Sequence, residues 1–224
     1  MKSLRSQSTL CGLIKVWADF ATSLDNVPII DKLARGKFRI NDYQNFLINH
    51  RQQVIEGSRW IARASSSITS EYAEQRSIFL RHAITEHRDY KMLEENYVST
   101  GGKLKDIIYA EKNIGSEALH AFMYNRASET NPFDLLGAMF IIEGLGQKKA
   151  LQWGNQIKEQ LQLDDKQVSF LLYHGANDTE HMKKFEQMLD SGILEIKDME
   201  KRIIKTAKIV ARLYRLQLEE IGNF

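Results

Sequence analysis

The chain has 224 residues and only two prolines, Pro28 and Pro132, and both lie where a helix can begin. Proline is tolerated in the first turn of a helix but breaks a helix elsewhere. Apolar residues recur at helical spacing along the chain, and glycines such as Gly36 and Gly192 follow the ends of these segments. No segment shows the sustained two-residue alternation of a half-buried strand. The sequence therefore predicts an all-α fold.

The predicted helices follow one another without a linker, an internal repeat or a low-complexity segment. We therefore expect a single helical domain over residues 1–224. Its expected helices cover residues 5–23, 28–35, 41–66, 70–99, 105–127, 132–160, 165–190 and 195–221. A chain of this length can bury a full core without disulfides.

Charge and cysteine content limit the classes of partner. The 31 basic and 29 acidic residues are closely interspersed, and the net charge is +2. Such a mixed surface gives no reason to expect nucleic acid or an anionic membrane as a partner. The longest nearly unbroken apolar run, residues 135–142, is too short to span a membrane. The single cysteine, Cys11, allows no internal disulfide and fits a reducing cytoplasm, so we expect a cytoplasmic protein that acts on a small molecule.

One polar pattern lies in the stretch YHGANDTEHMKKFEQML, which begins at Tyr173. On a helix, His174, Asp178 and His181 stand at positions i, i+4 and i+7. At about 100° per residue, their side chains point within roughly 60° of one another. Two imidazoles and a carboxylate on one face are typical of a metal site, but they can also be surface or capping residues. Taken alone, the pattern leaves both interpretations open.

The stretch LRHAITEHRDYKML repeats this spacing with His82, Glu86 and Asp89. Apolar residues flank the face that these three share, so we expect the face to point inward. His87 lies on another face, and we expect it to be solvated. The alternative is that His82 and Asp89 are exposed and pair locally with neighbouring arginines.

A lone carboxylate, Glu143, follows eight mostly apolar residues in LLGAMFIIEGLGQKKALQW. Burial of an ionised carboxylate is costly unless it is paired or binds a cation. Gly144 and Gly146 come directly after it, and glycines within a helix favour close packing or room for a ligand. The alternative is a simple ion pair with Lys148. We favour a buried ligand.

Together these stretches supply three histidines and four carboxylates from three helices. Imidazole and carboxylate ligands suit iron or manganese, and a ligand set without cysteine argues against a structural zinc site. Helical bundles build dimetal sites from inward-pointing Glu and His side chains on facing helices. We therefore expect a dimetal site that leaves coordination positions open for dioxygen or substrate.

The sequence also resembles a known superfamily. The stretch LARGKFRINDYQNFLINHRQQVIEGSRWIARA, residues 33–64, resembles the early helices of heme-oxygenase-like proteins. Glu143 in FIIEG and the run His174-x3-Asp178-x2-His181 resemble the later ligands of the dimetal branch, the heme-oxygenase-like diiron oxidases and oxygenases. The resemblance extends from about Leu33 to the end of the chain. It implies a heme-oxygenase-like helical bundle.

For this branch, the resemblance implies two irons per chain, with manganese as the alternative metal. Members usually supply a glutamate and a histidine from the helix that here contains HAITEHRDY. Glu86 can take the glutamate role, whereas the histidine position falls to Asp89 or His82. The implied metal ligands are His82, Glu86, Asp89, Glu143, His174, Asp178 and His181, and Glu143 is the candidate bridging and catalytic residue.

The implied function is a nonheme diiron oxidase or oxygenase that activates dioxygen to oxidise a small organic substrate. The main alternative is a metal-free protein on the same fold that binds a small ligand or serves cofactor biosynthesis. Metal storage is a third interpretation. The thiaminase-II branch is disfavoured because it uses a cysteine in the middle of the chain, and Cys11 lies near the start. We also expect a homodimer.

Overall fold

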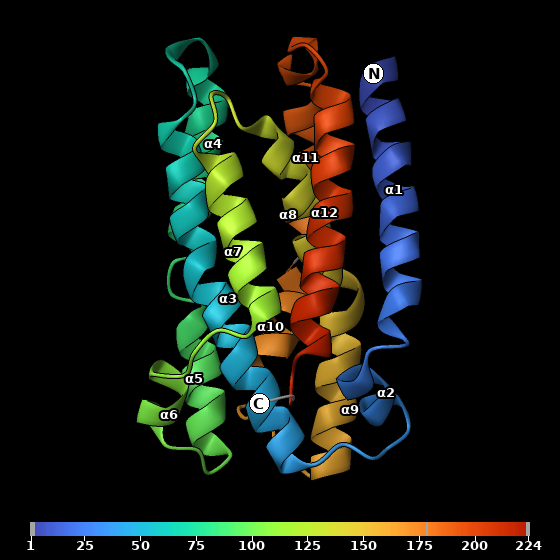
Figure 1. Cartoon of the computed structure of the whole chain (residues 1–224), viewed down its shortest axis with the longest axis vertical. Coiled ribbons are helices and arrows are strands. Elements are labelled where there is room, and N and C mark those ends of the chain that lie inside the picture. Colours follow the sequence, from blue (N-terminus) through green and yellow to red (C-terminus); the bar gives the residue numbers. More distant parts are fainter. Residues whose placement is uncertain (1–2, 178, 223–224) are drawn as a thin grey trace.

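The computed structural model describes residues 3–177 and 179–222, together with the side chains of all of these except 177 and 179–183. Among these residues there are helices and turns but no strand, which confirms the predicted all-α class. Most of the long helices run up or down an elongated bundle (Figure 1). The α-helices are α1 (Leu4–Leu24), α2 (Pro28–Ala34), α3 (Ile40–Ser66), α4 (Ala73–Glu86), α5 (Tyr90–Ser99), α6 (Leu104–Ile108), α7 (Ile114–Ala127), α8 (Leu136–Leu145), α9 (Leu151–Leu161), α10 (Ser169–Asn177), α11 (Thr179–Leu189) and α12 (Met199–Glu219).

Helix α12 lies between α1 and α7 and also packs against α8 (Figure 1). Two glycines let neighbouring backbones approach it closely. A Cβ atom at Gly137 of α8 would collide with the carbonyl oxygen of Ile203, and one at Gly115 of α7 would collide with the backbone of Gln217. These contacts require glycine, and they place α8 deep in the bundle with Glu143 near its end.

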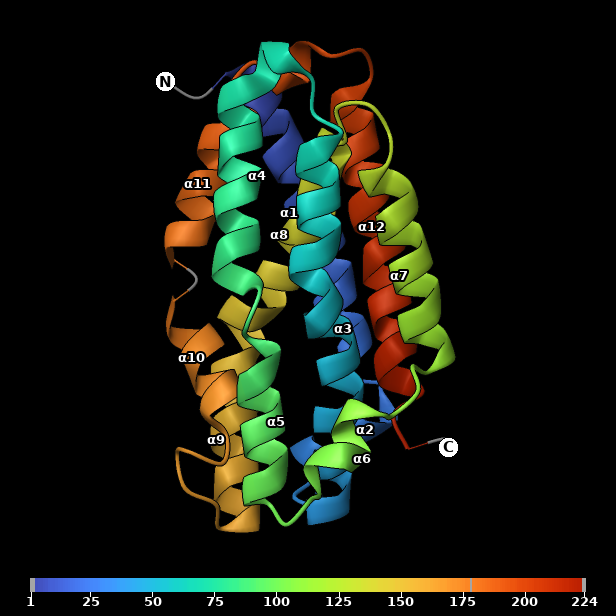
Figure 2. The same ribbon diagram turned by 90° about the vertical axis from the view of Figure 1, so that its left-hand side faces the viewer.

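The predicted helix over residues 70–99 is wrong in one respect, because the structure divides it into α4 and α5. Figure 2 shows the chain leaving α4, turning and continuing as α5 below it. Through the turn, the amides of Asp89 and Met92 bond to carbonyls three residues back, at Glu86 and Asp89. The ring Nδ1–H of His87 donates a hydrogen bond to the Ile84 carbonyl oxygen at 2.6 Å. The tighter hydrogen bonding ends the α-helical repeat before Asp89.

One other predicted helix is also divided. The segment 105–127 forms α6 and α7, because the Gln52 side chain binds the Ala110 carbonyl and Asn113 caps α7 by accepting from the Ser116 amide. The predicted helix over 165–190 contains α10 and α11, and residue 178, the position between them, lies outside the described residues. The last helix begins at Met199 because a 3₁₀ turn, η4 (Ile193–Glu195), comes before it.

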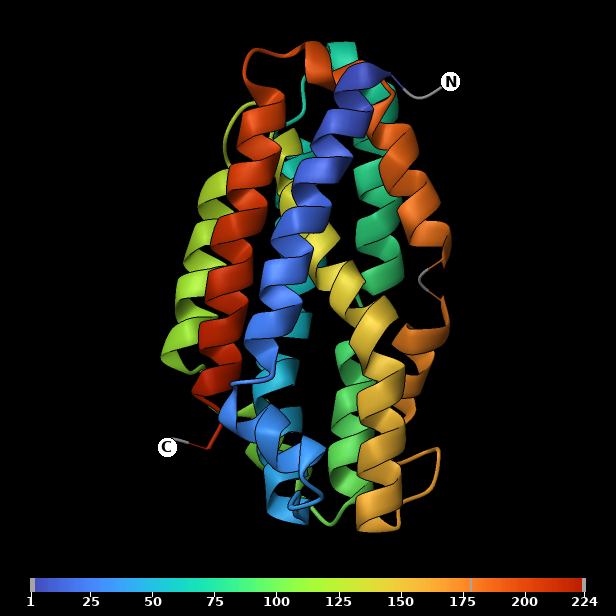
Figure 3. The ribbon, with the colours of Figure 1, turned by 90° about the vertical axis from the view of Figure 1, so that its right-hand side faces the viewer.

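The predicted helix over 132–160 is close to the structure. It begins with a 3₁₀ turn, η2 (Phe133–Leu135), and then runs through α8, a π-helical turn η3 (Gly146–Ala150) and α9 (Figure 3). Single π-turns inside long helices are rare and are frequently found at functional sites. Glu143 lies in the last turn of α8, just before this π-turn. None of the helices in the described part of the chain has both the length and the apolar character that a membrane span requires.

Candidate metal centre

Three of the predicted ligands, from α4 and α8, converge on one point. His82, Glu86 and Glu143 each offer a ligand atom, and these atoms all lie within 4.8 Å of one another. The Nε2 atom of His82 is 3.2 Å from Oε1 of Glu143 and 3.6 Å from Oε1 of Glu86. Their side chains are each about one-fifth exposed, at 20%, 21% and 18%. The spacing of one helical turn between His82 and Glu86 therefore does place both side chains toward α8.

A second pair joins the turn after α4 to α10. The Nε2 atom of His174 lies 3.4 Å from Oδ2 of Asp89, and the two side chains are 17% and 15% exposed. Asp89 reaches this position because the chain has left α4 and is about to begin α5, which packs against α10. Asp89 is therefore mostly buried and pairs with His174 rather than with a neighbouring arginine. Sequence spacing placed Asp89 on the face of a helix, whereas the structure places it in a turn.

The backbone of α10 comes close enough to position His174 because Gly175 has no side chain. A Cβ atom at Gly175 would come within 2.6 to 2.9 Å of Leu151 at the end of the π-turn η3. Helix α10 consequently packs directly against η3 and α9. The π-turn thus lies between Glu143 and the segment that carries His174.

Residues of both groups line one cavity. A cavity of about 100 Å³ is lined by His82, Glu86, Glu143, His174 and His50, with apolar residues around them. His50 comes from α3, and its ring stacks on Phe46 with centroids 5.1 Å apart. The sequence analysis assigned no partner to His50. Its position four residues after Phe46, on the apolar face of α3, is the one local signal that it points inward.

The charges in the cavity separate these histidines into two kinds. Burial alone would lower the pKa of His82, but hydrogen bonding and attraction from Glu143 and Glu86 outweigh it and raise the pKa to about 9. The pKa of His174 is also raised, because Asp89, Glu86 and Glu143 outweigh the opposing effect of burial. His50 has no such carboxylate, so burial and the charge of His174 lower its pKa to about 3. The carboxylates thus raise the pKa of two of the three rings, whereas the pKa of the third is lowered.

The structure therefore brings together five of the seven predicted ligands. His82, Glu86, Glu143 and His174 line one cavity, and Asp89 contacts His174. Asp178 lies outside the described residues, as does the side chain of His181, so their placement stays a prediction. His87 is exposed and bonds to its own helix, as expected for a residue off this face.

A larger cavity, of about 390 Å³, also reaches His82 and Glu143. The residues that line it all come from α4, α8 and α11. His82 and Glu143 line both cavities and so form part of the wall between them. A small molecule in the larger cavity can therefore contact the same two side chains that point toward the smaller one.

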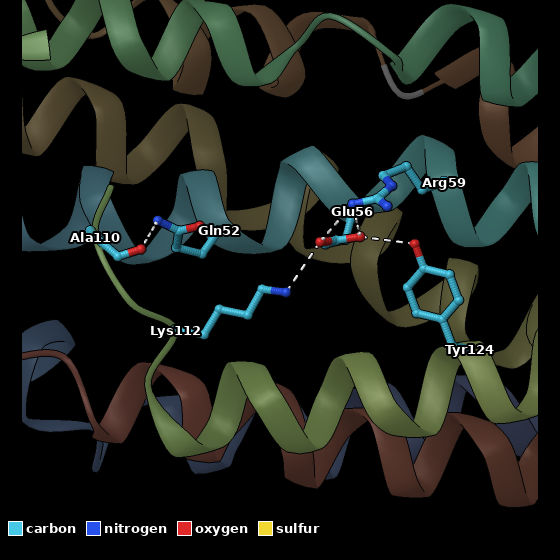
Figure 4. Close-up of polar contacts among 6 residues, drawn as sticks. All are labelled: Gln52, Glu56, Arg59, Ala110, Lys112 and Tyr124. Carbon is cyan, nitrogen blue, oxygen red and sulfur yellow. Dashed lines mark hydrogen bonds and ion pairs between the residues drawn. The ribbon is translucent and has the colours of Figure 1, made fainter. Parts of the chain in front are cut away.

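Another buried carboxylate, Glu56, lies between α3 and α7 and forms a separate cluster (Figure 4). Its carboxylate accepts hydrogen bonds from Lys112 at 3.1 Å, from Tyr124 at 2.8 Å and from Arg59 at 3.2 Å. Burial alone would raise the pKa of Glu56, but Tyr124 and Lys112 outweigh it and lower the pKa. Local sequence does not reveal this pairing, because Lys112 and Tyr124 lie 56 and 68 residues away along the chain.

The residues of the cavity fit a bound cation. Glu86, Asp89 and Glu143 are three carboxylates, and each contacts the imidazole of His82 or His174. The raised pKa of His82 means that a proton is held at the point where three ligand atoms converge. Oxygen and imidazole nitrogen donors on facing helices are the donor set of carboxylate-bridged dimetal sites.

A family model described as iron-containing redox enzyme matches residues 45–215 of the chain. A domain of unknown function with a heme oxygenase-like fold from Shewanella denitrificans is similar in structure, with a TM-score of 0.84 and 18% identity over 93% of this chain and 89% of that one. A TenA homologue from P. horikoshii has a TM-score of 0.74 and 12% identity over 96% and 98% of the two chains. A TenA homologue from Pyrococcus furiosus gives 0.70 and 14% over 96% and 98%. No curated protein matches the chain. At these identities the likeness shows a shared heme-oxygenase-like fold, as the sequence predicted.

Proposed function

We propose that this chain, which belongs to the iron-containing redox enzyme family, is a nonheme dimetal oxidase or oxygenase that uses dioxygen to oxidise a small organic substrate. The observation that carries the proposal is the convergence of His82, Glu86 and Glu143 within 4.8 Å. The Asp89–His174 pair beside them supplies further ligands to the same region. Iron is the metal that the family description names, and manganese remains the alternative.

The charges of the cluster suit two divalent metals. The carboxylates of Glu86, Asp89 and Glu143 contribute three negative charges, and the predicted ligand Asp178 would contribute a fourth. Two divalent ions would balance them, whereas the metal-free cluster instead holds a proton on His82. Metal binding therefore requires this imidazole to release its Nε2 proton. We expect iron uptake to be accompanied by proton release.

When bound, two irons would supply the electrons that turn dioxygen into an oxidant for an organic molecule. The chain's own residues would hold and shield that chemistry. Glu143 stands between the two cavities, so it is the best candidate to bridge the metals and face the substrate. Asp89 and His174 fix each other's orientation through their 3.4 Å contact. Buried apolar side chains such as Met139 and Phe170 limit access of water to the cluster.

The first test is metal loading of the wild-type protein. Iron(II) is added without oxygen, unbound metal is removed, and the iron content is measured before air is admitted. We expect about two irons per chain, consumption of oxygen, and a transient visible absorption. A matched variant, His87→Ala, should behave like the wild type, because His87 is exposed and lies off the cluster. Protein that binds no iron under these conditions would contradict the proposal.

The alternative is a metal-free protein that binds a small ligand or serves cofactor biosynthesis on the same fold. The structural likeness to TenA homologues is the observation that favours it. Cys11 is exposed on α1 and lines neither of the two cavities. This position argues against a mechanism with a cysteine nucleophile. Stoichiometric binding of a small organic molecule, unaffected by iron and by the loss of Glu143 or His174, would favour this alternative.

A further inference from the structure

Helix α3 contains a glycine, Gly57, that neither backbone conformation nor close packing explains. Four other glycines with open surroundings, Gly36, Gly101, Gly192 and Gly222, have φ values of +68° to +92°, a region that favours glycine. Gly57 instead lies in the interior of a regular helix, and a Cβ atom there would meet no atom of another part of the chain within 4 Å. Glycine in a helix interior is less stable than alanine. The open space beside Gly57 therefore needs another explanation.

This open space belongs to the smaller cavity. Gly57 lines that cavity together with His50, which stands seven residues before it and so lies about two turns away on the same face of α3. The other α3 residues of this wall are Phe46, Gln53, Val54, Trp60 and Ile61. None of them is a carboxylate, whereas the carboxylates that line the cavity come from α4 and α8. Helix α3 packs beside α4 (Figure 2). The cavity thus has candidate metal ligands from α4, α8 and α10 and a wall from α3 that carries no charge.

The imidazole of His50 is a polar group of this wall with an unsatisfied ring nitrogen. Its Nδ1 atom is buried, and no described residue forms a hydrogen bond with it. Aromatic contacts hold the ring, whose centroid lies 5.1 Å from that of Phe46 and 5.2 Å from that of Phe170. A buried polar group without a partner is costly. Since a neutral imidazole has one nitrogen that donates and one that accepts, the ring can bond to a small molecule in the cavity.

The size of the cavity limits what this molecule can be. A water molecule occupies about 30 Å³ in the liquid. A cavity of about 100 Å³ therefore has room for roughly three atoms of that size. A molecule of two or three heavy atoms fits, and it can contact the α3 wall and the candidate metal ligands at the same time. A larger carbon skeleton does not fit.

We propose that Gly57 and His50 form a subsite for a two- or three-atom ligand of the metal centre, which in the proposed reaction is dioxygen. Gly57 keeps the space beside α3 open, and His50 forms a hydrogen bond with the molecule that occupies it. This inference rests on the proposed function and assigns dioxygen binding to two residues that are not metal ligands.

The test uses nitric oxide as the probe, because it is a diatomic molecule of about the size of dioxygen and binds iron(II) reversibly. The iron(II)-loaded protein is titrated with nitric oxide in the absence of oxygen, and binding is followed by visible absorption. Iron content is measured on the same samples. The wild type should bind nitric oxide, and the N–O stretch in the infrared spectrum reports whether a hydrogen bond reaches it.

Variants at Gly57 test the open space. Gly57→Leu places a side chain in it and should weaken nitric oxide binding by roughly 10-fold or more, with the iron content of the wild type. Gly57→Ala adds one methyl group where nothing lies within 4 Å, so it should leave nitric oxide binding nearly unchanged. Ala62→Leu is the matched control, because Ala62 is exposed on α3 and lines neither cavity. Far-UV circular dichroism verifies that each variant is folded.

Variants at His50 test the hydrogen bond. His50→Phe keeps an aromatic ring but removes both nitrogens, so it should weaken nitric oxide binding by roughly 2- to 10-fold, the range for one hydrogen bond. It should also raise the frequency of the N–O stretch. His50→Gln retains a donor and an acceptor and should restore part of both changes. If His50 were only structural, His50→Phe would leave the N–O stretch where it is, and His50→Gln would restore nothing.

Iron content separates this inference from the proposed function. Fully iron-loaded protein whose nitric oxide binding is unchanged in Gly57→Leu and in His50→Phe would overturn the inference and leave the proposed function standing. Fully loaded wild type that binds no nitric oxide would overturn it as well. Wild type that takes up no iron would contradict the proposed function, and the subsite would fall with it.

Discussion

Two clusters of buried carboxylates lie in the same bundle, and they are completed in different ways. Glu56, between α3 and α7, accepts hydrogen bonds from Lys112, Tyr124 and Arg59 (Figure 4). The cluster at α4, α8 and α10 instead places carboxylates opposite imidazoles, as at Glu143 and His82. In the first cluster each carboxylate oxygen has a permanent donor. In the second, the positive charge comes from groups that can give up their proton.

The pKa shifts show what this difference means. Donors lower the pKa of Glu56 against the effect of burial, so its carboxylate stays ionised. At the neighbouring His120, burial and the charge of Lys112 lower the pKa to about 4, and the ring is neutral. At the other cluster the pKa of His82 is raised to about 9. The Glu56 cluster is complete without a ligand, whereas the His82 cluster must hold either protons or a cation. That contrast separates a structural ion pair from a candidate metal centre.

The largest expected effect is the loss of metal binding when a ligand of the second cluster is removed. Glu143→Ala or His174→Ala should weaken iron binding by more than the roughly 10- to 100-fold that loss of a residue behind a ligand costs. Oxygen consumption and the visible absorption should disappear with the iron. Metal analysis and an oxygen electrode measure both. If His87→Ala is as damaging as His174→Ala, the ligand from this part of the chain is His87, and the present assignment is wrong.

The next largest effect is on stability and belongs to the first cluster. Glu56→Ala leaves Lys112 and Tyr124 without their partner between two helices, so we expect it to lower the free energy of unfolding by about 1–3 kcal/mol. Chemical denaturation of the metal-free protein measures this loss. Iron binding by the folded variant should stay within a factor of about 2 of the wild type, since the two clusters share no residue. A variant that keeps its stability but loses iron would reverse the two assignments.

Local sequence patterns were sufficient for the features that depend on one helix. Helical spacing predicted the all-α class, and the interval of four residues correctly placed His82 and Glu86 on one face. The same reasoning failed at Asp89, because three-residue hydrogen bonds end α4 before it. Asp89 still reaches His174, by way of a turn rather than a helix face. A pattern based on 3.6 residues per turn contains no information about where a helix will break.

Features that depend on which helices are neighbours could not be predicted. His50 was not recognised as a cavity residue, because its place beside His174 depends on α3 and α10 packing around the same space. The partners of Glu56 are 56 and 68 residues away along the chain, at Lys112 and Tyr124. Nothing near these residues in the sequence indicates such pairing. The larger cavity likewise arises from the arrangement of α4, α8 and α11, and the smaller one brings together residues of α3, α4, α8 and α10.

A smaller effect should appear when the stability of the metal-free protein is measured against pH. The pKa of His82 in the folded protein is about 9, above its ordinary value of 6.5, so its stabilising charge is fully present below pH 6.5. That contribution is lost as pH rises from 6.5 through about 9. The slope should not exceed about 1.4 kcal/mol per pH unit for this one proton. The raised pKa of His174 adds a change in the same direction.

The same pH window should leave the Glu56 cluster unaffected. Its lowered carboxylate pKa and the pKa of about 4 at His120 both lie on the acid side, so their effects appear only as pH falls below 6.5. Denaturation at pH 6.5, 7.5 and 8.5 should therefore show a decline in the wild type and in Glu56→Ala. His82→Gln should flatten the decline. A slope that survives in His82→Gln but vanishes in Glu56→Ala would show that the pKa shifts have been assigned to the wrong cluster.

The smallest expected effect compares two cations on one carboxylate. The side chain of Arg59 is 66% exposed and that of Lys112 is 24% exposed, although both lie 3.1 Å from Glu56. Water and salt screen the exposed pair, so Arg59→Ala should lower the free energy of unfolding by less than about 1 kcal/mol. Lys112→Ala should cost more, because it removes the less exposed charge and frees the loop before α7 from α3. Repeating both measurements in 1 M salt should shrink the cost at Arg59 more than the cost at Lys112. If both substitutions lowered the free energy of unfolding equally and responded equally to salt, burial would not determine the strength of the ion pairs at Glu56. The Glu56 cluster could then not be treated as a structural ion pair that is complete without a ligand.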